Sequence, residues 1–213
     1  TWTFHGALKN TSVANVLIFF ASMPLIAALM SKIFLHEQVQ KVTWIAIGVV
    51  VLGLLLVSSQ GLIVGNWLGD FLALMCAVIM AGFFTIVRGR YTVNLIPATG
   101  FGLLLAALVA SPFAIYPEMS SSQWMYLIIG AGFILPIALG LLTIGPRYLP
   151  PPEAAMLSLL ETVLGPLWVW LVISEHPDTN TIIGGAIVVG TLFFHALWRM
   201  RQTNVLHQTQ LGK

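Results

Sequence analysis

The chain has 213 residues, of which 58% are hydrophobic and only 8% are charged, against roughly 25% charged residues in a soluble domain. A chain of this size cannot bury so much apolar surface away from water, so the composition excludes a soluble globular protein and predicts an integral membrane protein. The net charge of +2 comes from scattered basic residues and gives no sign of nucleic-acid binding, and the single cysteine excludes an intrachain disulfide.

Seven apolar segments are long enough to cross a bilayer, which takes about 17–25 residues per helix. Residues 1–10 are too short to span and resemble the end of an earlier helix, and the first residue is Thr1, so we expect that the chain lacks its natural start. The sequence therefore predicts an all-α polytopic membrane bundle with spans at 12–35, 42–59, 67–88, 97–116, 123–145, 152–174 and 180–198.

Basic residues predict the orientation of this bundle. Arg199 and Arg201 follow the last span, the other basic residues flank alternate turns, and the turns between them carry only acidic residues. By the positive-inside rule the C-terminus is cytoplasmic and Thr1 is outside, with Lys9 as the exception.

Two parts of the chain repeat each other. Residues 29–39 align with residues 167–177, which places Glu37 on Glu175 at an offset of 138 residues. An odd number of predicted spans separates these two glutamates, so they lie on opposite sides of the membrane. This pattern indicates an inverted-topology repeat, which is typical of secondary transporters.

The alignment extends beyond the two glutamates. It places Pro24 on Thr162 and Asn15 on Glu153, and with one residue less of spacing it places Gly48 and Gly53 on Gly185 and Gly190. We expect these glycines to allow close helix contacts. The repeat predicts a partial first unit at 1–60, a complete five-helix second unit at 66–199, and a cytoplasmic tail at 200–213.

These segments resemble a known family. Residues 7–39 and 44–57 resemble the end of a first EamA repeat of the drug/metabolite transporter superfamily, and residues 68–90, 154–175 and 182–197 resemble a whole second repeat. The resemblance implies a ten-helix carrier of a bacterial inner membrane. Such a carrier moves small metabolites, amino acids or drugs, usually outward and often in exchange for protons. Thr162 departs from the family pattern, which usually has proline after the glutamate.

Glu161 is the main candidate functional residue, because a charge near the middle of a span costs about 2.5–3.5 kcal/mol on insertion scales. Ser158, Glu161 and Trp168 recur at helical spacing and share one face, while leucines occupy another. We expect this face to line a central cavity, with Glu161 binding a proton or cation and Trp168 forming an aromatic wall. The alternative is a protonated Glu161 that only hydrogen-bonds a neighbouring helix.

The corresponding face of the first span is apolar and includes Phe20 and Met23. Methionine adapts to varied shapes, so this surface suits an amphipathic or aromatic substrate, with ordinary helix packing as the alternative. Asn15 lies near a span end and either contributes to this site or caps its helix.

Other residues have expected structural roles. Glu37 and Glu175 end their helices, where the helix dipole disfavours an acid, so each needs a local partner. Pro24 and Pro166 lie inside spans, where proline removes a hydrogen bond and bends a helix. His195, close to the end of the last span, is expected at the membrane interface.

Other classes fit less well. A seven-helix receptor-like or structural membrane protein without transport activity would not need the inverted repeat, and a retinal protein needs a lysine that residues 180–198 lack. The serine, zinc and aspartyl motifs of intramembrane enzymes do not occur. We expect no enzyme activity, cofactor or metal. The expected partners are a small-molecule substrate, the lipid bilayer and protons, and a homodimer stays open.

Overall fold

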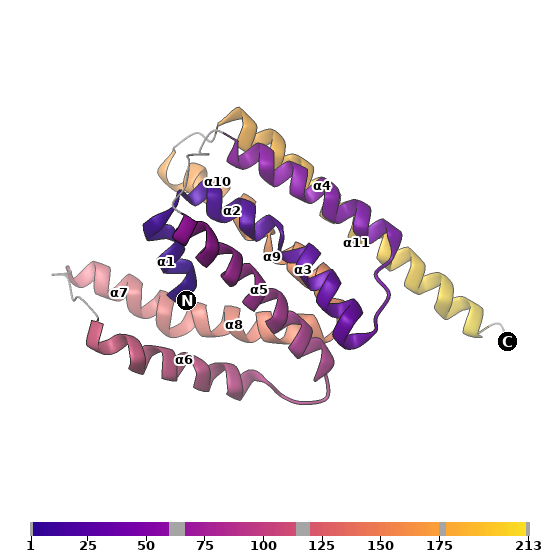
Figure 1. The fold of residues 1–213 in the computed structure, drawn as a ribbon, viewed down its shortest axis with the longest axis horizontal. Coiled ribbons are helices and arrows are strands. Elements are labelled where there is room, and N and C mark those ends of the chain that lie inside the picture. The colour runs from indigo at the N-terminus through magenta and orange to yellow at the C-terminus, as the bar shows by residue number, and fades with distance from the viewer. Residues whose placement is uncertain (1, 60–66, 114–119, 175–177, 212–213) are drawn as a thin grey trace. The chain divides into compact units, whose positions relative to one another are not determined.

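The computed structural model describes residues 2–59, 67–113, 120–174 and 178–211 (Figure 1). All regular structure in these ranges is helical. The elements are α1 (Trp2–Asn10), α2 (Val13–Ala21), α3 (Met23–Met30), the π-helix η1 (Ser31–Leu35), α4 (Lys41–Ser58), α5 (Trp67–Gly89), α6 (Ile96–Ala110), the 3-10 helix η2 (Ser111–Phe113), α7 (Ser121–Ile129), the π-helix η3 (Gly130–Ile134), α8 (Leu135–Ile144), the 3-10 helix η4 (Gly145–Arg147), α9 (Pro151–Ser158), α10 (Leu160–Ile173) and α11 (Thr179–Leu211).

Six helical segments in the described residues are long and apolar enough to cross a membrane, which confirms the predicted all-α membrane bundle. They are Asn15–Leu35, Lys41–Ser58, Trp67–Gly89, Ser121–Arg147, Pro151–Val172 and Thr179–Arg201.

The predicted seventh span, 97–116, differs from the others. Its α-helix, α6, has 15 residues and is therefore about 22 Å long at 1.5 Å per residue, shorter than the hydrocarbon core of about 30 Å. The α-helix gives way to a 3-10 turn at Ser111, next to Pro112, which has no N–H to continue the helical hydrogen bonds. Residues 114–116 of this predicted span lie outside the described residues.

The chain forms two compact units, Thr1–Thr85 with Pro151–Lys213 (the large unit) and Ile86–Pro150 (the small unit). In the large unit α4 packs along α11, α3 packs on α9, and α2 packs on α4. Its core includes Phe84, Ile47, Leu54, Met156, Leu159, Val16 and Val188. In the small unit α6 packs against α8, where the hydroxyl oxygens of Thr99 and Thr143 lie 3.3 Å apart.

The helices α4 and α11 are antiparallel. Thr43 and His195 are in contact at one end of the pair, and the Asn180 amide donates to the Ser59 hydroxyl at the other end, at 3.0 Å. Between these contacts, a Cβ added at Gly184 would lie 2.5 Å from the carbonyl oxygen of Gly53. Only glycine at position 184 therefore allows the two backbones to approach this closely.

The glycine pattern of the sequence predicts part of this crossing. Gly53 lies at the contact as expected, and Gly185 packs against Val163, whose methyl carbon would be 2.9 Å from an added Cβ. The expectation for Gly48 and Gly190 is wrong, because a Cβ added at either would meet nothing within 4 Å among the described residues.

Both of the aligned spans are interrupted. The first is broken at Ser22, between α2 and α3, where the Ser22 hydroxyl donates to the carbonyl of Phe19. Pro24 lies just after this break and is buried. The second span is broken at Leu159, between α9 and α10, and Pro166 lies further on, inside α10.

The same two spans end alike. His36 follows η1 with φ of 55°, and Ser174 follows α10 with φ of 62°; these are the non-glycine residues with positive φ in the described chain. They are 138 residues apart, which is the offset of the sequence alignment. The Ser31 hydroxyl donates to the Glu37 carboxylate at 3.2 Å, whereas Glu175 lies outside the described residues.

Candidate functional site

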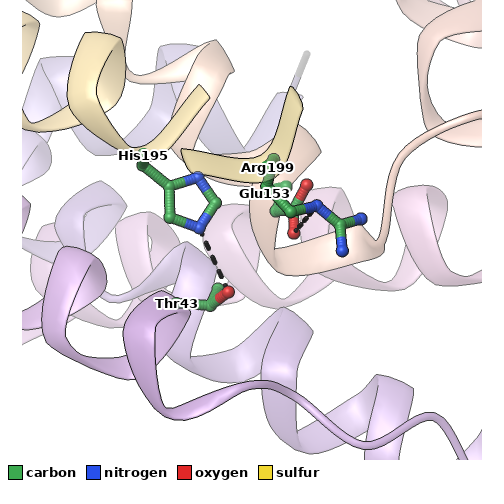
Figure 2. A network of polar contacts seen from close by, with 4 residues as sticks. All are labelled: Thr43, Glu153, His195 and Arg199. Atoms are coloured by element: carbon green, nitrogen blue, oxygen red, sulfur yellow. Dashed lines mark hydrogen bonds and ion pairs between the residues drawn. The ribbon is translucent and has the colours of Figure 1, made fainter. Parts of the chain in front are cut away.

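Four polar residues of the large unit gather where α4, α9 and α11 meet (Figure 2). We call Thr43, Glu153, His195 and Arg199 the polar cluster. The Arg199 Nε atom lies 3.1 Å from the Glu153 Oε1 atom, and the His195 Nε2 atom lies 3.1 Å from the Thr43 hydroxyl oxygen. Glu153 is 7% exposed and His195 is 8% exposed, so both are shielded from the surroundings.

The local sequence explains these positions. Glu153 is the third residue of α9, directly after Pro151 and Pro152, which suit the first turn because proline has no N–H to leave unpaired there. A carboxylate in the first turn also interacts favourably with the helix dipole. His195 and Arg199 are four residues apart on α11 and so share one face of that helix.

The Glu153–Arg199 ion pair connects α9 to α11. A buried carboxylate is stable only while a charge and hydrogen bonds compensate it, so separating these helices would expose both partners or leave one of them unpaired. The Thr43–His195 contact connects α4 to the same face of α11. The polar cluster therefore joins three helices by contacts that break and reform as units.

A second polar group in the large unit lies at the start of α5. The Thr11 hydroxyl donates to the Asp70 carboxylate at 2.8 Å, and the Asn15 amide donates to the Thr11 hydroxyl at 3.0 Å. Asn15 is 8% exposed, so it lies inside the protein as part of this group.

The other predicted site residues fall into two sets. Glu161 and Trp168 lie on exposed positions of α10, with Trp168 61% exposed. Ser158 is half-buried and donates to the Ala154 carbonyl at 3.0 Å. Met23 is 4% exposed in α3, which packs on α9. Phe20 packs against the small apolar cluster of Ala7, Val16 and Ala73. The structure thus brings the elements of Met23 and Ser158 together and leaves Glu161 and Trp168 on the surface of the described chain.

The polar cluster itself was missed. Glu153 was aligned with Asn15, and both are buried polar residues with polar partners, so the alignment held a usable signal. The expectation of an interfacial His195 is wrong, because Thr43 and the neighbouring helices enclose it. Among the described residues no group of three histidine, cysteine, aspartate or glutamate side chains could hold a metal ion.

Comparison with known proteins places this architecture. The family model of the EamA-like transporter family matches residues 2–59 and 67–197. A search of curated proteins finds no match. A solved chain titled only "Crystal structure of protein" superposes with a TM-score of 0.79 at 21% identity, and the match covers 94% of this chain and 73% of that one. At that identity the superposition shows a shared fold, while the family match covers most of the chain. The chain belongs to the EamA-like transporter family and is a membrane transporter.

Proposed function

We propose that the protein is a secondary active transporter that moves small metabolites, amino acids or drugs by alternating access. The observation that carries the proposal is the recurrence of one unit at a fixed offset. His36 and Ser174 end two interrupted spans in the same left-handed backbone conformation, 138 residues apart. Units of opposite orientation around a shared axis are the usual frame for alternating access.

The contact between α4 and α11 supports the same frame. With one residue less of spacing, the alignment places Thr43 on Asn180 and Ser58 on His195. The Thr43–His195 contact therefore has a counterpart in the Ser59–Asn180 contact, one residue from the equivalent position. An in-plane two-fold axis between inverted repeats at 1–60 and 66–199 would produce such a pairing, with 200–213 as a cytoplasmic tail of an inner-membrane protein.

In this proposal the polar cluster acts as a latch at one end of the transport path. The Glu153–Arg199 pair holds α9 against α11 in the state seen here, and breaking it lets α9 and the attached α10 move. The α9–α10 break at Leu159 supplies the hinge, because Leu159 and Thr162 both make i to i−3 hydrogen bonds there instead of a regular α-helical pattern.

Glu161 is the proposed proton-coupling group. It lies on an exposed position of α10 inside a membrane-crossing segment, and contact of its charge with lipid would cost about 2.5–3.5 kcal/mol. A water-filled path or a polar partner is therefore needed on that face. Ser158 and Trp168 on α9 and α10, with Met23, Phe20 and Asn15 of the first span, are the proposed substrate contacts.

The test is transport by the Glu161→Gln variant in proteoliposomes, with a pH gradient and a panel of amino acids and aromatic cations. We expect at least a tenfold loss of proton-driven flux with unchanged membrane insertion and thermal stability, because the side chain is exposed in the fold. Asp178→Asn, a matched change at an exposed turn, should keep full flux. Full proton-driven flux by Glu161→Gln would remove Glu161 from the mechanism.

A further inference from the structure

One end of the small unit carries three arginines without an acidic counterpart. Arg88 and Arg90 lie at the end of α5, and Arg147 lies at the end of η4. Between residues 86 and 150 the sequence contains one acidic residue, Glu118, in the stretch that joins α6 to α7 and outside the described residues. The stretches 86–113 and 120–150 contain none.

Backbone carbonyls hold these arginines in place. The Arg88 Nη1 atom donates to the carbonyl of Arg147 at 2.9 Å, and the Arg147 Nη2 atom donates to the carbonyl of Val93. The Val93 amide in turn donates to the Arg90 carbonyl at 2.9 Å, which closes the turn. A carbonyl accepts a hydrogen bond but does not neutralise a positive charge, so the guanidinium groups are positioned while their charge stays uncompensated by a carboxylate of this unit.

Arg147 is held with part of its hydrogen-bonding capacity unused. Its Nε atom is buried and has no hydrogen-bond partner among the described residues. A planar guanidinium offers a fork of donors that matches the oxygens of a phosphate group. The cluster is therefore a preformed receptor for a phosphate anion.

The surroundings indicate where that phosphate comes from. Tyr91 is 65% exposed and Tyr148 is 76% exposed beside the arginines in sequence, and tyrosine favours the headgroup layer of a bilayer. The helices that lead away from this end present apolar side chains: Leu104 is 70% exposed and Leu141 is 63% exposed. A phosphate at the arginines would continue into acyl chains along these helices.

We propose that Arg88, Arg90 and Arg147 form a binding site for the phosphate headgroup of an anionic phospholipid. The arginines hold the phosphate, the two tyrosines lie at headgroup depth, and the apolar faces of the small unit contact the acyl chains. Basic sites at the ends of membrane helices bind anionic headgroups in this manner.

The experiment titrates phosphatidylglycerol or phosphatidylcholine with the same acyl chains into the purified full chain in detergent. Native mass spectrometry counts the bound lipid, and thermal unfolding reports stabilisation. We expect phosphatidylglycerol to bind preferentially. The Arg90→Gln/Arg147→Gln variant should bind it roughly thirtyfold more weakly, since each basic residue near a membrane surface contributes a factor of about five.

Controls separate this site from general charge attraction. The Lys9→Gln/Arg201→Gln variant loses the same charge outside the small unit and should bind phosphatidylglycerol within twofold of the unmodified protein. Arg90→Gln alone changes an exposed side chain, so it tests the site if the double variant does not fold, with about a fivefold loss expected. Equal binding of the two lipids, or equal losses in the two double variants, would overturn the proposal. Equal stabilisation and competition by inorganic phosphate would overturn the lipid assignment in favour of free phosphate.

Discussion

Glu153 is a carboxylate that the protein shields almost completely, and its pairing with Arg199 is the clearest residue-level interaction in the fold. The pair is asymmetric, because the Arg199 side chain is 33% exposed while that of Glu153 is 9% exposed. Solvent or headgroups can therefore reach the arginine but not the carboxylate. The energetic cost of losing the pair depends on which partner remains.

We expect Glu153→Gln to destabilise the fold by about 1–3 kcal/mol. Removing one partner of a buried pair costs about 3–5 kcal/mol, and the partial exposure of Arg199 lowers that cost. Denaturant unfolding in mixed micelles measures it. The Glu153→Gln/Arg199→Gln variant should recover at least half of the loss, since no isolated charge remains. Additive losses in the double variant would contradict the pairing.

Residue chemistry in the sequence predicts charged positions better than it predicts their partners. Glu161 stands out because it lies mid-span, whereas Glu153 follows two prolines and looks like an ordinary helix start. The partner of Glu153 is 46 residues further along the chain. Their meeting depends on how α9 packs near α11, and periodicity within one helix does not contain that information.

At the scale of elements, the crossing of α4 and α11 depends on small residues. Gly184 of α11 faces Gly53 and Val57 of α4, so the backbones touch without intervening side chains. In a membrane, such close packing replaces the hydrophobic driving force that lipid does not supply.

Gly184→Ala should push these helices apart. An added Cβ would lie 2.5 Å from the Gly53 carbonyl oxygen and 2.8 Å from a Val57 methyl carbon, and overpacking of this kind costs about 1–3 kcal/mol. Thermal unfolding in detergent measures the loss. Gly190→Ala, on the same helix, meets nothing within 4 Å among the described residues and should be neutral or slightly stabilising. Equal effects of the two changes would contradict the crossing.

Helix positions were largely predictable, and helix rotations were not. Long apolar runs fix six spans to within a few residues, because membrane helices need a minimum length. The repeated glycine spacing suggests a contact face but does not fix its direction, which is why Gly184 was missed while Gly190 was chosen. The break before Pro112 shortens α6, and hydropathy alone does not register it.

At the scale of the whole molecule, the family match and the shared fold make this chain a membrane transporter. The structure adds a pair of interrupted spans that end alike and an antiparallel contact between α4 and α11. Alternating access through inverted repeats requires that the turns after these two spans face opposite sides of the membrane. That requirement is the central claim of the proposed mechanism.

The measurement that tests it is cysteine labelling in sealed, oriented vesicles with a membrane-impermeant maleimide. A Cys76→Ser background removes the single native cysteine, and one cysteine is introduced at Gln38, Thr92 or Asp178, all of which are exposed. We predict that positions 38 and 92 label from one side and position 178 from the other. Labelling of positions 38 and 178 from the same side would mean that 96–113 does not cross the membrane, and it would contradict the inverted repeat.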